Sequence, residues 1–461
     1  METSADDARE SAYTALATVL LGAGVLGALW ALDVYVLRTR VLTVFRGLMP
    51  LTPLYAFWNP LLRPSALPFA AAATLVVAVA PALADPRRTS RAGFLAALLA
   101  LALLLPATLF LVRQPWGMLG SQFVVYPGEE FIADADRIQD LRTFLATYVD
   151  AMREHLLSLH GAHFPPGHAV LLYGVRRAFG AGVFPAAVVV LVSFALAIVV
   201  AFAALRTLGG EARARAGALL LLAAPSLLDY ACTSMDAMFL LVATATWWVS
   251  LRAFGRAGTP AEALLAGAML LLATCVSFST FPLGLAMAAY AVFLGPSHWR
   301  RGARQLALAA IVYGLGAGLL FAGTGFALWE CVREARTSGI ALMAQIIKTQ
   351  PSTIWGHLSY GNLVAFLIGS GLALVAATGL RLRAGGVLRE PWTLAALTTI
   401  AVMGLGGIYF METERIWLFA MPWLAAIAVG RGAPTAGTLR VFLAAGCAQA
   451  LAMEVLLYTL W

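Results

Sequence analysis

Carboxylates concentrate in one segment of an otherwise apolar chain. Seven of the 23 Asp and Glu residues lie between Glu129 and Glu154. Charged groups in or beside a lipid bilayer are costly, so such a concentration indicates a functional site. Grouped carboxylates can act as a general base toward a hydroxyl group or bind a divalent cation such as Mg²⁺ or Mn²⁺. We favour Asp134 for catalysis and, with Glu130, as a cation ligand, whereas for Asp136 catalysis and helix capping both remain open.

Two histidines flank a Pro-Pro turn in the sequence HFPPGH, residues 163–168. A histidine at the start of a helix near the membrane surface can bind a phosphate group. The prolines fix the direction in which the chain leaves the turn. We therefore predict that His163 and His168 bind phosphate, and the alternative is a surface turn with incidental histidines.

Three charged residues, Glu412, Glu414 and Arg415, lie between apolar segments in the sequence YFMETERIWLF. Charges in such a position need partners or a polar cavity. The planar guanidinium group of Arg415 is suited to bidentate phosphate binding, and an ion pair with Glu412 is the alternative. Glu412 and Arg415 are therefore candidate substrate-binding residues. Lys348 is a further phosphate candidate. Asp236 is expected to cap a helix, and the alternative is that it faces the site.

The composition indicates that these residues belong to a helical membrane protein. Hydrophobic residues make up 61% of the 461 residues and charged residues 12%, whereas about 25% of a typical soluble protein is charged. Apolar runs of about 20 residues recur and lack the period-2 alternation of barrel strands. We predict an all-α, polytopic protein with about 13 spans, folded as a single integral membrane domain, 1–461. The predicted spans are 12–36, 66–84, 92–112, 183–205, 216–230, 236–252, 261–278, 281–296, 305–328, 361–380, 391–410, 416–430 and 441–460.

Arginines predict the orientation of these spans, because cytoplasmic loops of membrane proteins are rich in positive charge. A cytoplasmic N-terminus places most arginines in cytoplasmic loops. With this orientation, the non-cytoplasmic face carries the two large loops, 113–182 and 329–360. The corner 229–236 and residues 411–415 lie on the same face. We therefore expect one composite, non-cytoplasmic site, and the alternative is that outer loops are simply more polar.

The same arginine pattern bears on partners and location. The net charge of +8 does not predict nucleic-acid binding, since the arginines sit in short clusters between apolar runs. High arginine and alanine usage is associated with bacterial proteins, so we expect the plasma (inner) membrane of a bacterium. Membrane lipids are then obligatory partners.

The loop 113–182 contains a predicted amphipathic helix. Apolar residues recur at helical spacing from Arg137 to His160. Asp134 or Asp136 is expected to cap this helix, which would lie along the outer leaflet. The Pro-Pro turn ends it, and a second short helix, 169–179, is expected to lead toward the next span.

An acidic segment, an amphipathic helix and then HFPPGHAVLLY, in this order, resemble the GT-C membrane glycosyltransferases. The closest branch is that of the protein O-mannosyltransferases and aminoarabinose transferases. LLLLAAPSLLDYACTSMDAMFLLVAT, WGHLSYGNLVAFLIG and METERIWLFAMPWL extend the resemblance, which covers residues 113–430 as an order of short features. The chain departs from the family at Phe164, which stands where the family has a basic residue before the prolines; His163 comes one position earlier.

This resemblance implies a sugar transfer at the non-cytoplasmic face. The donor would be a polyprenyl-phosphate-linked sugar, and the acceptor a lipid, glycan or protein. The family's general base or metal partner falls by position on Asp134, with Glu130 or Asp136 as substitutes. The lipid phosphate would be held by Arg415, His163 and Lys348. An inverting displacement needs only a positioned base, phosphate stabilisation and orientation of the reactants.

Other functions remain open. A transporter or lipid flippase also needs many spans and intramembrane charges, although internal repeats typical of transporters are not evident. Another lipid-linked polysaccharide polymerase or ligase, or a non-catalytic assembly subunit, fits the same composition. The chain has no Walker motif, no dinucleotide-binding glycine motif in a βαβ context and no paired cysteines, which disfavours a nucleotide-powered or redox enzyme.

Overall fold

The computed structural model describes residues 5–32, 54, 56–125, 130–180, 182–347, 355–406, 409, 412–430 and 432–459. These residues are mostly helical, and the two strands among them pair antiparallel, with Phe57 opposite Tyr458. The predicted all-α class is therefore confirmed.

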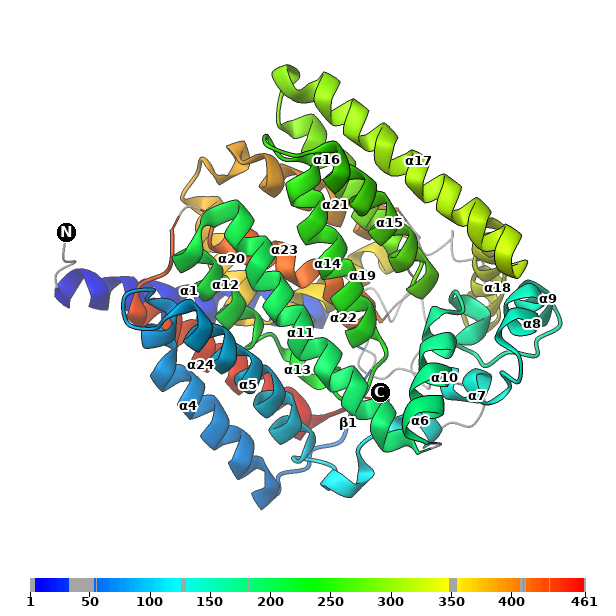
Figure 1. Cartoon of the computed structure of the whole chain (residues 1–461). Helices are drawn as coiled ribbons and strands as arrows, with labels where there is room; N and C mark the ends of the chain where they lie inside the picture. Colours follow the sequence, from blue (N-terminus) through cyan, green and yellow to red (C-terminus); the bar gives the residue numbers. More distant parts are fainter. Residues whose placement is uncertain are drawn as a thin grey trace.

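Long helices make up most of the described chain, and short ones connect them (Figure 1). The longer helices are α1 (Ala5–Leu32), α4 (Leu67–Ala84), α5 (Arg91–Phe110), α10 (Gly167–Phe179), α11 (Val183–Gly209), α12 (Glu211–Leu221), α14 (Asp236–Phe254), α15 (Pro260–Val276), α16 (Thr280–Phe293), α17 (Trp299–Thr324), α18 (Leu328–Ile347), α19 (Trp355–Ser370), α20 (Leu372–Arg383), α21 (Pro391–Leu405) and α24 (Ala436–Leu456). The shorter ones are α6 (Gln122–Val125), α7 (Phe131–Asp136), α8 (Leu141–Ala146), α9 (Tyr148–Arg153), α13 (Pro225–Asp229), α22 (Thr413–Ile416) and α23 (Met421–Ala428). Single 3-10 turns are η2 (Pro64–Ala66), η3 (Trp116–Met118), η4 (Gly161–His163), η5 (Pro296–His298), η7 (Val387–Arg389) and η8 (Leu418–Ala420), and the strands are β1 (Ala56–Trp58) and β2 (Leu457–Thr459).

Seven described helical segments are long and apolar enough to cross a membrane. They are Glu10–Leu32, Pro64–Ala84, Arg91–Phe110, Val183–Gly209, Asp236–Phe254, Pro296–Thr324 and Ala436–Leu456. Each overlaps a predicted span, so the chain is a helical membrane protein. Shorter apolar helices, α15, α16, α21 and the segment Leu418–Ala428, coincide with further predicted spans. The count of thirteen spans stays a prediction.

Two predicted spans are broken. The span 216–230 is divided into α12 and α13, because Pro225 disfavours helical backbone at the residue before it; Ala224 is extended, with φ −77° and ψ 118°. The span 361–380 corresponds to α19 and α20, which are bent by 105° relative to each other. Gly371 lies at this bend with a φ of 88°, a conformation that glycine adopts without steric cost.

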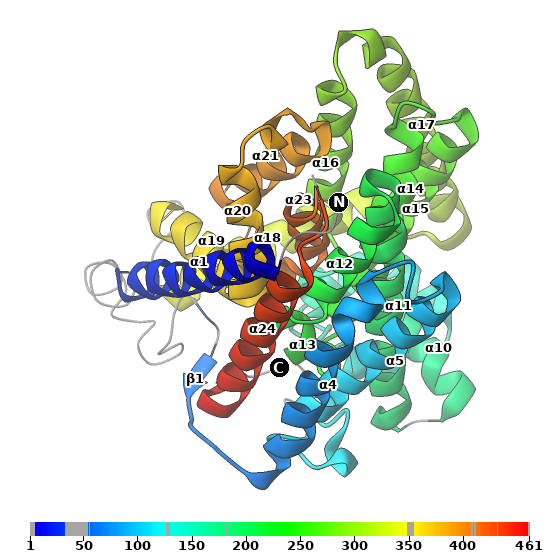
Figure 2. The ribbon, with the colours of Figure 1, turned by 90° about the vertical axis from the view of Figure 1, so that its left-hand side faces the viewer.

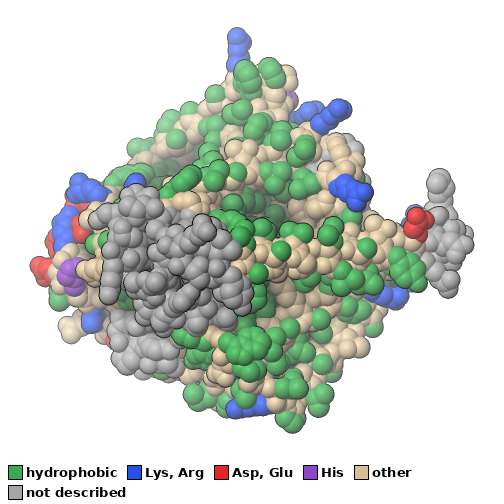
Figure 3. Space-filling model, turned by 180° about the vertical axis from the view of Figure 1, so that it is seen from behind, with side chains coloured by type: hydrophobic (Ala, Val, Ile, Leu, Met, Phe, Trp, Pro, Cys, Tyr) green, Lys and Arg blue, Asp and Glu red, His purple; other side chains and the backbone are tan. Residues whose placement is uncertain are grey.

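The surface of the described chain is rich in apolar side chains. Figure 3 shows them across one face, with charged side chains mainly near its edges. Only 17% of the apolar window of α1 and 11% of that of α17 are buried. Leu20, Leu21, Leu315 and Leu319 are among the exposed residues. Exposure of this kind fits contact with lipid acyl chains. α1 also contacts α19, α20 and α24 (Figure 2).

The two predicted large loops lie against each other. The loop 113–182 forms α6 to α10, and the loop 329–360 begins as α18, beside α9 and η4 (Figure 1). Arg153 of α9 forms ion pairs with Glu330 and Glu334 of α18, with N–O distances of 3.0 and 3.5 Å. The described parts of these loops therefore contact each other, and their position on the non-cytoplasmic face stays a prediction.

The amphipathic helix predicted over 137–160 is shorter in the structure. Asp140 caps α8 by accepting a hydrogen bond from a backbone N–H of its first turn at 2.7 Å, whereas Asp134 and Asp136 lie inside α7. α9 ends before His155, whose φ of 55° is left-handed. The helix expected after the Pro-Pro turn is confirmed as α10.

Candidate functional site

A small polar cavity lies between the short loop helices, the start of α14 and α22. Its volume is about 10 Å³, room for roughly one water molecule. We call its lining residues the polar site: Glu130, Phe131, His160, Phe164, His168, Thr233, Ser234, Met235, Asp236 and Arg415. Three of the predicted site residues, Glu130, His168 and Arg415, are therefore brought together from distant segments.

Arg415 supplies the positive charge of the polar site and is 7% exposed. Its Nη2 donates a hydrogen bond to Glu412 Oε2 at 2.5 Å, and its Nη1 lies 3.4 Å from Asp236 Oδ2. Burial disfavours the charged guanidinium group, but these carboxylates more than compensate and raise the pKa of Arg415 above its usual value. The predicted alternative, an ion pair with Glu412, is present.

Asp236 faces the polar site instead of capping α14. It is the first residue of the helix, and Met235 occupies the N-cap position. Its Oδ2 accepts a hydrogen bond from Ser234 Oγ at 2.7 Å and lies beside Arg415. The expectation that Asp236 caps a helix was wrong, because the ion pair with Arg415 draws its side chain toward α22.

His168 is an uncharged group of the polar site. It is 1% exposed and packs on Phe131, with 4.7 Å between ring centres. Burial lowers the pKa of His168 to about 4, and Arg415 acts in the same direction while Asp236 opposes it. Its Nδ1 has no hydrogen-bond partner within the described parts of the chain. A neutral ring nitrogen is therefore available to a ligand.

His160 was not predicted as a member of the site. Its Nδ1 lies 3.5 Å from Glu130 Oε1, and its ring stacks on Phe131 with 5.5 Å between centres. Glu130 itself is 7% exposed. In the sequence, His160 stands three residues before His163, and no periodicity places it at the cavity.

Asp134 lies outside the polar site and is completely buried. Its carboxylate accepts hydrogen bonds from Ser158 N at 2.8 Å and from Ser158 Oγ at 2.5 Å, and Arg137 lies 3.8 Å away. Burial raises the pKa of Asp134, although the Ser158 hydrogen bonds and Arg137 oppose this shift. A Cβ atom on Gly161 would lie 2.2 Å from Asp134 Oδ2. Asp134 thus fixes the turn that carries His160.

The other predicted residues lie around the polar site. Asp136 is half-exposed and forms an ion pair with Arg176. His163 Nδ1 donates a hydrogen bond to Leu159 O at 2.6 Å, and its Nε2 lies 3.2 Å from Ser338 Oγ of α18. His163 does not line the cavity. Lys348 lies outside the residues that the structure describes.

The placement of the carboxylates does not fit the predicted cation site. Within the described ranges, no group of three or more His, Cys, Asp or Glu side chains is arranged to hold a metal ion. Asp134 is engaged with Ser158, away from the cavity that Glu130 lines. The divalent cation stays a prediction, and the roles proposed below belong to side chains alone.

A second small cavity adjoins the polar site at Thr233, which lines both. Its volume is about 40 Å³, and Arg113, Asp229 and Glu454 contribute its ionisable side chains. Arg113 donates to backbone carbonyls of Asn59 and Glu454, and burial lowers its pKa. Sequence reasoning missed this cluster, because its residues come from three distant segments.

Comparison of the chain with protein-family models, curated proteins and solved structures found no match. The geometry of the polar site therefore carries the functional argument.

Proposed function

We propose that the protein is a membrane glycosyltransferase. It moves a sugar from a polyprenyl-phosphate-linked donor to a lipid, glycan or protein acceptor at the non-cytoplasmic face. The observation that carries this proposal is the buried, charged Arg415 beside Asp236 and Glu130. A guanidinium group enclosed by low-dielectric surroundings stabilises a phosphate leaving group more strongly than one in water. The resemblance to the GT-C enzymes supports the same reading.

The proposed reaction is a single displacement. An acceptor hydroxyl oxygen attacks the anomeric carbon of the donor, the bond from that carbon to the phosphate oxygen breaks, and the configuration inverts. Arg415 exchanges Glu412 for the departing phosphate, and a carboxylate takes the hydroxyl proton. Glu130 fits this general-base role better than Asp134, because Glu130 lines the cavity whereas Asp134 is held by Ser158. His168 donates or accepts one hydrogen bond to the substrate.

A cavity of about 10 Å³ is too small for a phosphate group. We therefore propose that α7 and α10 move away from α14 when the donor binds. This movement would separate α10 from α11 and α15, which it contacts.

The arginine asymmetry supports the rest of the assignment. We place the protein in the plasma (inner) membrane of a bacterium, with the N-terminus in the cytoplasm and the polar site on the opposite face. A lipid-linked polysaccharide polymerase or ligase would differ from this proposal only in its acceptor. Assays with different acceptors distinguish these activities.

The test is transfer of labelled sugar from polyprenyl-phosphate donors in proteoliposomes. Loss of a general base typically lowers the rate by about 10²–10⁴-fold, so we expect that loss for Glu130→Gln. Asp150→Asn is the matched control, because this carboxylate is 66% exposed and lies on α9, outside the polar site. Transfer that survives in folded Glu130→Gln but disappears in Asp134→Asn would return the base role to Asp134. Wild-type protein inactive with every donor would contradict the enzyme proposal.

A transporter or lipid flippase is the second candidate, and the bend of 105° between α19 and α20 favours it. Broken helices often form the binding sites of transporters. Movement of a fluorescent lipid between leaflets of the same proteoliposomes, in the absence of sugar transfer, would support this candidate.

A further inference from the structure

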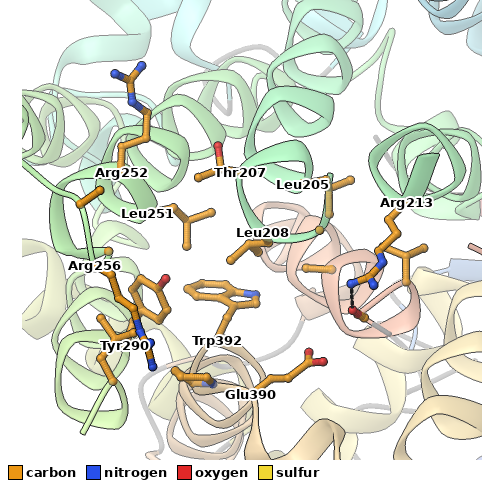
Figure 4. Close-up of a pocket in the computed structure, with 18 of the residues that line it drawn as sticks. Leu205, Thr207, Leu208, Arg213, Leu251, Arg252, Arg256, Tyr290, Glu390 and Trp392 are labelled. Atoms are coloured by element: carbon orange, nitrogen blue, oxygen red, sulfur yellow. Dashed lines mark hydrogen bonds between the residues drawn. The ribbon is translucent and has the colours of Figure 1, made fainter. Parts of the chain in front are cut away.

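A large cavity lies at the other end of α14 from the polar site. It has a volume of about 630 Å³ and lies among the ends of α11, α14, α16, α21 and α23. We call it the arginine pocket, after Arg213, Arg252 and Arg256 in its wall (Figure 4). α14 has 19 residues, so the two sites are roughly 28 Å apart along this helix.

The charges of the arginine pocket leave a formal excess of one positive charge, because Glu262 and Glu390 oppose the three arginines. Arg252 pairs with Glu262 at 2.7 Å, and Arg213 donates a hydrogen bond to the backbone carbonyl of Gly430 at 2.5 Å. Within the described residues, the guanidinium group of Arg256 forms no hydrogen bond or ion pair, and it lies near Tyr290 in the pocket wall. The pocket therefore matches a ligand with a single negative charge.

Trp392 provides a second, independent indication of a ligand. It is 5% exposed, and its Nε1 has no hydrogen-bond partner in the part of the chain that the structure describes. Figure 4 shows the indole in the middle of the pocket, with its nitrogen on the side where Arg213 and Glu390 lie. Burial of an unsatisfied N–H group costs free energy. A ligand oxygen that enters the pocket would satisfy it.

The remaining wall is apolar, with Leu205, Leu208, Leu251, Leu294 and Val429 among its residues. α11 and α14, which end here, are both membrane-span candidates. Basic pockets between the ends of membrane helices bind lipid headgroups at the cytoplasmic surface. A soluble anion would use the arginines but not this apolar wall.

We propose that the arginine pocket binds the phosphodiester headgroup of a membrane lipid. Arg256 and Arg213 contact the phosphate oxygens, and Trp392 Nε1 donates a hydrogen bond to the headgroup. The adjoining leucines contact the first part of the acyl chains. This site is separate from the polar site and does not depend on the reaction proposed there.

The test is native mass spectrometry of the purified protein in mild detergent, titrated with phosphatidylglycerol. We expect Arg256→Gln to weaken binding about fivefold, the effect of one positive charge near an anionic headgroup. Arg304→Gln is the matched control, since Arg304 is exposed on α17 and outside the pocket. Trp392→Phe keeps an aromatic ring and removes the donor, so a smaller weakening is expected. Size-exclusion profiles establish that each variant is folded.

Two further ligands identify the source of the phosphate. Diacylglycerol has the acyl chains without the phosphate, and glycerol 3-phosphate has the phosphate without the chains. Weak binding of both, together with the Arg256 effect, supports the proposal. Tight binding of diacylglycerol, tight binding of glycerol 3-phosphate, or equal phosphatidylglycerol binding by the Arg256 and Arg304 variants would each overturn it.

Discussion

The two ends of α14 use charge in different ways. At its first residue, Asp236 meets Arg415 in a buried cavity of about 10 Å³, where carboxylates surround the guanidinium group. Near its last turn, Arg252 lies at a cavity of about 630 Å³, where its side chain is 52% exposed. In the proposed reaction, the first arrangement would stabilise a charge that develops inside the protein, whereas the second has space for a ligand. One apolar helix therefore separates a small, buried charged cavity from a larger one.

The largest expected loss of stability comes from removal of the buried guanidinium group of Arg415. Arg415→Gln leaves Asp236 and Glu412 without their positive partner, which should lower the free energy of unfolding by about 3–5 kcal/mol. Arg256→Gln at the other end should change it by less than about 0.5 kcal/mol. Thermal unfolding in detergent measures both, and equal melting temperatures for the two variants would remove the contrast between the ends of α14.

Gly161→Ala tests how tightly the wall of the polar site is packed. The new Cβ atom would meet Asp134 Oδ2 at 2.2 Å, so we expect a loss of about 1–3 kcal/mol from overpacking. Gly174→Ala in α10 is the matched control, because a Cβ there meets nothing within 4 Å. A helical glycine replaced by alanine gains about 0.5–1 kcal/mol. Opposite signs for the two variants in thermal unfolding would support the described packing, and a neutral Gly161→Ala would contradict it.

The buried imidazole group of His168 gives the polar site a predicted pH dependence of stability. Its folded pKa of about 4 lies below the usual value of 6.5, so the unfolded chain binds more protons between these values. The free energy of unfolding should therefore fall as the pH drops, by about 1–2 kcal/mol from pH 7 to pH 5. His168→Gln should show a smaller fall in melts at the two pH values. If the His168→Gln variant loses as much stability between pH 7 and pH 5 as the wild type, His168 is not the source of the pH dependence.

The smallest change in the free energy of unfolding is expected at the last turn of α14, beside the arginine pocket. Arg252→Gln removes an ion pair with Glu262 in which Arg252 is half-exposed, so the loss should be about 0.2–1 kcal/mol. Added salt should reduce the difference from wild type, because exposed pairs are screened. A loss as large as that of Arg415→Gln would show that the two ends do not differ as described.

Sequence reasoning reached the elements that local patterns encode. Apolar length identified the membrane helices, the Pro-Pro turn located the start of α10, and the charges in METER indicated the Glu412–Arg415 pair. It did not reach contacts that depend on a distant neighbour. The hydrogen bonds that hold Asp134 outside the polar-site cavity could not be predicted, because its partner, Ser158, is 24 residues away in the chain.

The remaining misses have similar causes. Pro225 could have indicated the break before α13, whereas nothing local distinguishes Gly371 from the other glycines in apolar helices. The apolar stripe over 137–160 predicted one continuous helix. It therefore gave no indication of the N-cap at Asp140 or of the left-handed backbone at His155. Side-chain packing of the loop against α14 and α22, which no periodicity reports, brings His160 into the polar site.

The hydrogen bonds from Ser158 to Asp134 also have a consequence for motion. α7 has six residues and η4 has three, so neither forms enough internal hydrogen bonds to persist alone. Glu130 directly precedes α7, and His160 directly precedes η4. Because Asp134 links the two segments, we expect them to detach and return as one cooperative unit. Glu130 and His160 would then leave and rejoin the polar site in a single local-unfolding equilibrium.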